Sequence, residues 1–301
     1  MLNIFMALLP LISLIALGYV LQRSQFLSQD FWRGAERLNY FVLFPVLLFS
    51  NLAFVELDLA KLMWLLLAML VTIAIVSLSL WGIKHFFAIQ PAQFGVYIQS
   101  HIRFNTYIGL ALVSSLFGSQ GMQTFAMMIA IAIPAVNIIS LLAFSQQNSN
   151  WKSNGLAVIK NPLILGCIAG VLFNLTGFKL VSGLHNLMSL LASVSLPLGL
   201  LAVGAALQFQ ALKQDMWRLG LNSVGRLVVV PLFAYVIAQW FGLSKFESLV
   251  MTVFFALPTA SASYILTRYV NGDYPLMAGV ISLQTLLFIL SFPCLMYLLE
   301  L

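Results

Sequence analysis

The chain has 301 residues, of which 62% are hydrophobic and only 7% are charged. Soluble domains carry charge on about a quarter of their residues, so the composition excludes a water-soluble fold and predicts an all-α polytopic membrane protein. The formal net charge of +6 is explained by basic residues near one membrane surface, and it does not indicate a nucleic-acid partner.

Apolar stretches long enough to cross a bilayer occur along the whole chain. A membrane-spanning helix needs about 20 predominantly apolar residues. In chain order the predicted spans are 2–22, 38–55, 62–83, 92–118, 123–144, 161–178, 186–212, 219–241, 248–267 and 274–299. The uncharged stretch 104–151 is divided at Gly118-Ser119-Gln120-Gly121, which is a turn signal. The sequence therefore predicts ten transmembrane helices.

Similar motifs recur in the two halves of the chain. Pro10-Leu11-Ile12 with Gly18 recurs 152 residues later as Pro162-Leu163-Ile164 with Gly170, Pro45 recurs as Pro197, and Met63-Trp64 recurs as Met216-Trp217 at an offset of 153. Five spans per half is an odd number, so the second copy is inverted relative to the first, as in many secondary transporters. The predicted division is a first repeat at 1–145, a cytoplasmic linker at 146–160 and a second repeat at 161–301.

Lysine and arginine are unevenly distributed over the predicted loops. With the N-terminus outside, nine of them lie in inner loops and three in outer loops, while Arg103 and Arg226 lie within spans. Cytoplasmic loops are enriched in basic residues. This bias predicts that the N-terminus and the C-terminus both lie outside the cell.

Two predicted spans contain sequences that interrupt a helix. The span 248–267 carries Pro258, which removes a backbone donor, followed by small or hydroxylated residues. The span 92–118 carries a polar segment, and an offset of 153 aligns Asn105 with Pro258. Irregular backbone at membrane depth occurs where it lines a cavity or is buried in protein. The paired interruptions predict a substrate site, although a simple proline kink would also explain the interruption at Pro258.

Arg103 and Arg226 lack an acidic partner in the sequence, because no Asp or Glu lies inside a predicted span. An arginine at mid-span costs about 2.5–3.5 kcal/mol. Helix C-terminal carbonyls, snorkelling or a bound anion can each offset this cost. His101 is interpreted as a packed, hydrogen-bonded histidine or as a group that titrates near neutral pH.

Several segments together resemble the auxin efflux carrier family, specifically its short bacterial members. These segments are Asn39–Pro45, Arg103–Gly109, Pro134–Ile138, Asn161–Ile164, Pro197–Leu207 and Pro258–Ala260. The resemblance implies a scaffold of helices 1, 2, 6 and 7 and a transport domain of helices 3–5 and 8–10. It also implies that the broken helices 4 and 9 cross, and that the substrate binds beside this crossing. A homodimer through the scaffold helices is a further expectation.

The expected function is export of small organic anions, either auxin-like acids or dicarboxylates, across the bacterial inner membrane by an elevator mechanism. The expected substrate-binding residues are Arg103, Asn105, Thr106, Tyr107, Asn137, Pro258, Thr259, Ser261 and Ser263, with His101 and Arg226 as accessory residues. Two alternatives are a sodium- or proton-coupled organic-acid symporter and a receptor that does not translocate its ligand. No metal, cofactor or enzymatic activity is expected, because no catalytic or metal-binding motif occurs.

Overall fold

The computed structural model of the chain describes residues 2–54, 59–144, 161–213 and 215–299, and the predicted linker 146–160 lies outside them. Within these ranges the chain is helical and contains no strand. The elements are α1 (Leu2–Arg23), α2 (Gln29–Leu38), η1 (Asn39–Leu43), α3 (Phe44–Ala53), α4 (Leu59–Phe87), α5 (Pro91–Ile102), α6 (Thr106–Phe144), α8 (Pro162–Thr176), α9 (Ser182–Ala205), η2 (Phe209–Lys213), α10 (Met216–Val224), η3 (Gly225–Val229), α11 (Val230–Trp240), α12 (Lys245–Ala256), α13 (Ala262–Tyr269) and α14 (Tyr274–Leu298). η1 and η3 are single π-helical turns and η2 is a 3₁₀ turn.

Six helical stretches of the described chain are long and apolar enough to cross a membrane. They are Ile4–Arg23, Leu62–Phe87, Pro91–Phe144, Ser182–Ala205, Met216–Trp240 and Tyr274–Leu298. The predicted spans 92–118 and 123–144 fall within one of them, where the division lies at Gly118 with φ of 62° and ψ of −150°. Glycine adopts this backbone conformation without a steric penalty. The chain is therefore an all-helical, multi-pass membrane protein.

The helix α2 is not predicted by hydropathy, because four of its residues are charged. It forms as an amphipathic helix instead. The Ser28 hydroxyl accepts a hydrogen bond from the Phe31 N–H at 3.1 Å, which caps the helix start. Trp32 and Ala35 are buried on its inner side. The helix continues through η1 into α3, so the predicted span 38–55 is the second part of a longer helical segment.

Two helix pairs, α1 with α9 and α3 with α8, pack closely along their lengths. A methyl group added at Gly18 would overlap the Leu201 carbonyl, and one added at Gly170 would crowd the backbone of Phe49. Small residues permit this close approach of helix backbones in membranes. Gly18 and Gly170 are 152 residues apart, as are Phe49 and Leu201. The same contact therefore occurs twice, once in each helix pair.

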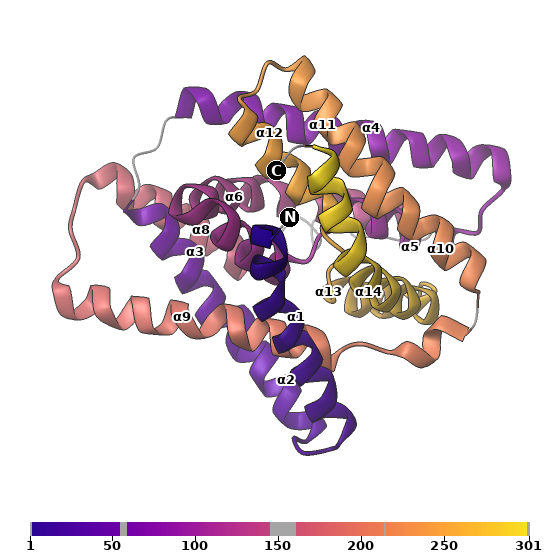
Figure 1. Cartoon of the computed structure of the whole chain (residues 1–301), viewed down its shortest axis with the longest axis horizontal. Helices are drawn as coiled ribbons and strands as arrows, with labels where there is room; N and C mark the ends of the chain where they lie inside the picture. Colours follow the sequence, from indigo (N-terminus) through magenta and orange to yellow (C-terminus); the bar gives the residue numbers. More distant parts are fainter. Residues whose placement is uncertain (1, 55–58, 145–160, 214, 300–301) are drawn as a thin grey trace.

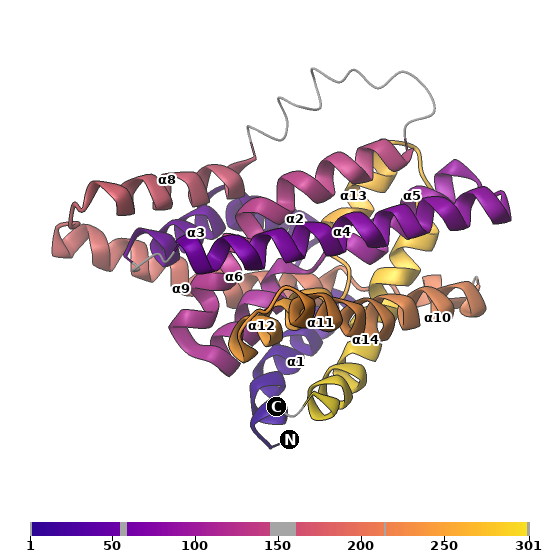
Figure 2. The same cartoon turned by 90° about the horizontal axis from the view of Figure 1, so that it is seen from above.

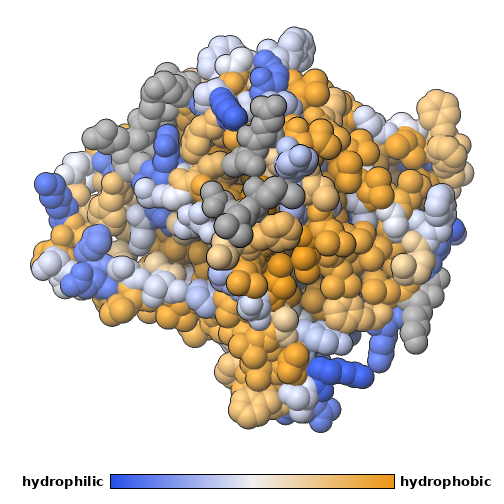
Figure 3. Space-filling view, viewed as in Figure 1, coloured by the Kyte–Doolittle hydropathy of each residue, from blue (hydrophilic) through white to orange (hydrophobic). Residues whose placement is uncertain are grey.

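The helices enclose a buried centre and expose an apolar exterior. In both ribbon views the first turns of α1 lie near the end of α14 (Figures 1 and 2). Apolar side chains cover most of the face shown in Figure 3, and hydrophilic side chains gather mainly near its periphery. Large exposed apolar side chains include Leu190, which is 68% exposed. Such a surface requires the hydrocarbon core of a bilayer as its solvent.

Candidate functional site

The helical backbone is interrupted twice in the interior of the molecule. α5 ends at Ile102 and α6 begins at Thr106, which leaves residues 103–105, termed here the first break. α12 ends at Ala256 and α13 begins at Ala262, which leaves residues 257–261, termed the second break. The two interruptions coincide with the polar segment and with the proline segment of the sequence.

The two breaks contact each other directly. The Asn105 N–H donates a hydrogen bond to the Pro258 carbonyl at 2.8 Å. The Asn105 side-chain oxygen accepts a hydrogen bond from the Ile108 N–H at 3.2 Å and so caps the start of α6. Asn105 is only 2% exposed, and its Nδ2 has no partner in the described part of the chain. A buried donor without an acceptor costs about 1–3 kcal/mol, so this amide is available to a ligand or a water molecule.

The hydroxyl groups at the second break are of two kinds. Thr259 is satisfied: its Oγ1 lies 3.0 Å from the Ser100 carbonyl oxygen and 2.7 Å from Gln284 Oε1. The hydroxyls of Ser261 and Ser263 are buried without a partner among the described residues. Both serines lie at the start of α13, where a helix carries partial positive charge. The unsatisfied hydroxyls and the positive helix end therefore occur together.

A buried amide network holds the second break in place. Gln284 on α14 accepts a hydrogen bond from the Thr259 N–H at 2.9 Å and donates from Nε2 to Asn222 Oδ1 at 3.0 Å. Asn222 on α10 in turn donates to the Ser100 hydroxyl on α5 at 2.8 Å. All four side chains are buried. The only sequence signal for Gln284, Asn222 and Ser100 is their polarity inside predicted spans, so sequence patterns do not single them out.

Arg226, on the π-helical turn η3, joins the ends of two helices. Its side chain is fully buried. Nε donates to the Leu257 carbonyl at 2.8 Å, and Nη1 donates to the His101 carbonyl. Leu257 follows the last residue of α12, and His101 lies in the last turn of α5. Helix C-terminal carbonyls thus serve as partners of this arginine, while its Nη2 has none within the described ranges.

His101 itself is packed and hydrogen-bonded. Its Nδ1 lies 2.8 Å from the Tyr97 carbonyl oxygen and 3.2 Å from the Ser100 hydroxyl. These contacts fit the interpretation of His101 as a structural histidine at the end of α5.

Arg103 lies in the first break and is partly buried. Its Nη1 donates to Gln99 Oε1 at 3.0 Å, and Gln99 Nε2 donates to the Thr267 hydroxyl of α13 at 2.8 Å. The Tyr40 side chain of η1 interacts electrostatically with this guanidinium. Arg103 therefore connects the first break with α13 through Gln99 and lies near η1.

The remaining predicted residues differ in their distance from the breaks. Thr106 begins α6 beside Asn105. The Tyr107 ring packs edge-on against Phe44, with ring centroids 4.9 Å apart, and lies tightly against Gly199 of α9. Asn137 lies in the second part of α6, beyond the kink at Gly118, and no hydrogen bond within the described residues links it to either break.

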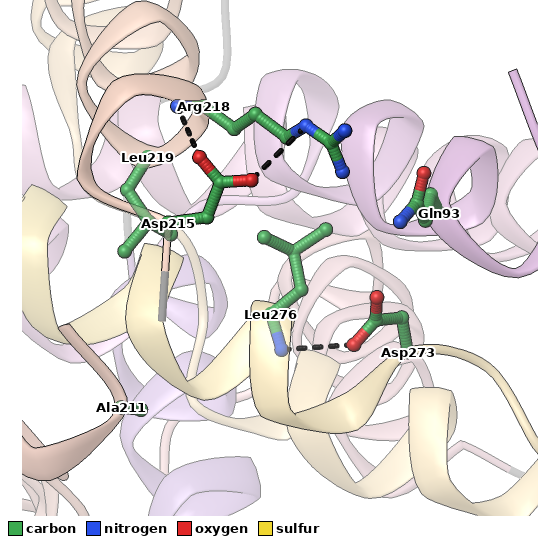
Figure 4. Close-up of a pocket in the computed structure, with 7 residues that line it drawn as sticks. All are labelled: Gln93, Ala211, Asp215, Arg218, Leu219, Asp273 and Leu276. Carbon is green, nitrogen blue, oxygen red and sulfur yellow. Dashed lines mark hydrogen bonds and ion pairs between the residues drawn. The ribbon is translucent and has the colours of Figure 1, made fainter. Parts of the chain in front are cut away.

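Two cavities lie beside this region rather than within it. An apolar cavity of about 160 Å³ lies between α1 and α14 and reaches Ile108 in the first turn of α6. A polar cavity of about 80 Å³ is lined by Gln93, Asp215, Arg218 and Asp273, together with Ala211, Leu219 and Leu276. Figure 4 shows that its two aspartates each bond to the first turn of the helix that they precede. Neither of these two cavities is lined by a residue of the breaks.

Comparison with known proteins decides the family. A family model described as "Membrane transport protein" matches residues 3–155 and 149–296. The chain belongs to the membrane transport protein family. This family is that of the auxin efflux carriers, so the resemblance seen in the sequence is confirmed.

Relatives of this membrane transport protein support a role in transport. It is 23% identical over 292 residues to an uncharacterized transporter of Methanothermobacter thermautotrophicus, and the matched residues make up 95% of both chains. It is 25% identical over 211 residues to an uncharacterized transporter of Methanocaldococcus jannaschii, which covers 67% of both chains. A sodium-dependent organic anion transporter of Mus musculus is 24% identical over 119 residues, which are 38% of this chain and 32% of the relative. The protein is a membrane transporter.

Proposed function

We propose that this transporter exports small organic anions and binds their carboxylate beside the two breaks. The observation that carries the proposal is the contact between Asn105 and Pro258, which lies next to unsatisfied buried donors. The start of α6 and the start of α13 each add about half a positive charge. Arg103 adds a full positive charge in the first break. A carboxylate is the ligand chemistry that such donors and charges favour.

The proposal divides the chain into ten spans arranged as an inverted repeat. In this arrangement α5 with the start of α6 forms the fourth span, and α12 with α13 forms the ninth. Two observations support the duplication. The contact of Gly18 in the first half with Leu201 in the second half has a counterpart in the contact of Gly170 with Phe49. Gly170 lies 152 residues after Gly18, and Leu201 lies 152 residues after Phe49. Asn105 and Pro258, which are equivalent at an offset of 153, touch each other, as equivalent positions do only near a two-fold axis.

Alternating access would occur by movement of one group of helices against the other. The scaffold would consist of α1, α2–α3, α8 and α9, whose pairs are locked by close glycine contacts. The transport domain would consist of α4–α6 and α10–α14. Its parts are joined by the buried network of Gln284 and by Arg226. Each group is thus tied internally, which an elevator mechanism requires.

An inner-membrane location with both termini outside, as the basic residues predict, gives export a driving force. Moving one elementary charge through 100 mV is worth about 2.3 kcal/mol. This free energy corresponds to roughly a 50-fold concentration ratio for a monovalent anion. Export down an inside-negative potential then needs no coupled ion.

The proposal is tested by anion flux in liposomes under an imposed membrane potential. Indole-3-acetate, malonate and succinate are suitable probes, and we expect flux of at least one of them to follow the potential. N105A should lower that flux by about 10- to 100-fold, because a hydrogen bond to a charged group contributes about 1.5–3 kcal/mol. N51A is the matched control, since among the described residues the Asn51 side chain bonds to the Leu47 carbonyl of its own helix. Unchanged flux in N105A would exclude this site.

A sodium-coupled organic-anion symporter is the second candidate. It is favoured by the name of the mouse relative, a sodium-dependent organic anion transporter. Uptake that requires an inward sodium gradient in the same liposomes would support the symporter against potential-driven export. Binding of the acids without flux under either gradient would instead indicate a receptor.

A further inference from the structure

Four helix ends meet at the two breaks. The C-terminal ends of α5 and α12 enter them, and the N-terminal ends of α6 and α13 leave them. A helix end carries about half an elementary charge, which is negative at the C-terminus and positive at the N-terminus. The four ends alone therefore sum to about zero, and on their own they would attract an anion no more than a neutral molecule.

Arg226 is placed on the negative pair of these ends only. Its Nε bonds to the Leu257 carbonyl at the end of α12, and its Nη1 bonds to the His101 carbonyl at the end of α5. The side chain is fully buried, so water does not screen its charge. The ion pairs of the described chain, Arg33–Asp30 and Arg218–Asp215, lie elsewhere. No carboxylate among the described residues cancels the charge of Arg226.

We infer that Arg226 strengthens the preference of the transport site for anions without touching the substrate, in addition to the positive charge that Arg103 places in the first break. One positive charge offsets the two negative helix ends, which together carry about one negative charge. The positive ends of α6 and α13 are then left uncompensated, and they face the unsatisfied donors of Asn105, Ser261 and Ser263. Arg226 is thus a specificity-determining residue. This inference rests on the proposed anion site at the breaks.

The competing role for Arg226 is direct contact with the substrate through Nη2. The two roles differ in what they demand of the side chain. Direct recognition of a carboxylate by an arginine depends on the planar, forked guanidinium, which lysine does not reproduce. An effect of charge alone depends on the positive charge, which lysine keeps. Lysine and glutamine substitutions therefore separate the two roles.

The test measures dissociation constants in detergent for matched acid and amide probes, namely indole-3-acetate against indole-3-acetamide and succinate against succinamide. The wild type should prefer an acid over its amide. R226Q should bind the acid about tenfold more weakly and the amide unchanged, because a unit charge acting over about 10 Å at an effective dielectric constant of about 20 changes affinity by roughly that factor. R226K should keep the preference to within about threefold.

R218Q is the matched control, because Arg218 is half-exposed and pairs with Asp215 at 3.1 Å in the polar cavity. It should leave the acid-to-amide ratio unchanged. An unchanged ratio in R226Q, or a loss in R226K equal to that in R226Q, would overturn the inference alone. A wild type that binds acids and amides equally, or no acid, would contradict the proposed function itself. If R226Q is not recovered as a folded protein, R226K provides the test. An acid-to-amide ratio like that of the wild type would support the inference, and loss of the preference for the acid would overturn it.

Discussion

At the scale of single residues, the buried polar atoms around the breaks divide into a satisfied set and an unsatisfied set. Thr259, Gln284 and Asn222 bond to one another and to α5. Asn105 Nδ2 and the hydroxyls of Ser261 and Ser263 have no partner in the described chain. The first set fixes the position of the second break, and the second set remains available for binding. Substitutions in the two sets should therefore affect different properties.

Replacing Gln284 should lower stability. Q284L removes the acceptor of the Thr259 N–H and the donor to Asn222, and it leaves these buried groups unpaired. Each unpaired group costs about 1–3 kcal/mol. We expect a clear fall in Tm in detergent. T124V is the control, because within the described part of the chain the Thr124 hydroxyl bonds to the Gln120 carbonyl of its own helix, and its loss should change Tm little. Equal Tm values for Q284L and the wild type would show that the network does not stabilise the break.

The sequence predicts some of these residues and not others, for a physical reason. Pro258 and the polar segment around Asn105 break a local helical pattern, so they are visible in the sequence. Gln284 and Asn222 are scattered polar residues in otherwise apolar spans, and their partners Thr259 and Ser100 lie 25 and 122 residues away along the chain. The partners of Arg226 are backbone carbonyls, which every residue carries. Such contacts are determined by the packing of the helices and not by any local motif.

At the scale of helices, glycines on α1, α8 and α9 permit the close packing of the scaffold pairs, and Gly18 and Gly170 are two of them. Gly18 and Gly170 each face the backbone of a neighbouring helix, whereas nothing lies within 4 Å of a methyl group added at Gly82 in α4.

The helix α2 illustrates a limit of prediction at this scale. Hydropathy finds apolar helices, and it overlooks a helix that buries only one side.

Alanine at Gly18 or Gly170 should therefore destabilise the protein, by about 1–3 kcal/mol for an overpacked interface. We expect both G18A and G170A to lower Tm, and G18A to lower it more, because the added methyl group would overlap the Leu201 carbonyl oxygen but would lie 2.9 Å from that of Phe49. G82A is the matched control and should be neutral or slightly stabilising, since alanine is favoured over glycine inside a helix. Tm values for G18A and G170A that equal the value for G82A would contradict the close packing.

At the scale of the whole molecule, the proposed movement requires α1 to slide past α14 and the segment attached to it. The 3₁₀ turn η2 is attached to α14, because the Gln208 N–H donates to the Ser282 hydroxyl at 2.9 Å. Across the boundary, the Tyr19 ring of α1 packs edge-on against the Phe209 ring of η2, with centroids 4.8 Å apart. This pair is therefore a place where a short cross-link would join the two groups of helices.

A cross-link between Y19C and F209C, made in a background without Cys167 and Cys294, should abolish flux, and reductant should restore it. The control joins F49C with F173C, because these rings lie within the scaffold with centroids 5.6 Å apart. That cross-link should leave flux intact. Full flux through a protein cross-linked at positions 19 and 209 would rule out a sliding movement at this boundary.

The contact between Asn105 and Pro258 has a consequence for how the two breaks are held against each other. Identical residues at such a position could exchange two reciprocal backbone bonds, which would hold the segments flat against one another as in a small ladder. Proline has no N–H to give, so only one bond can form here. The proline therefore leaves the orientation of the two segments to the side chains that bridge them, namely Thr259, which contacts the Ser100 carbonyl, and Arg226, which bonds to the carbonyls of His101 and Leu257.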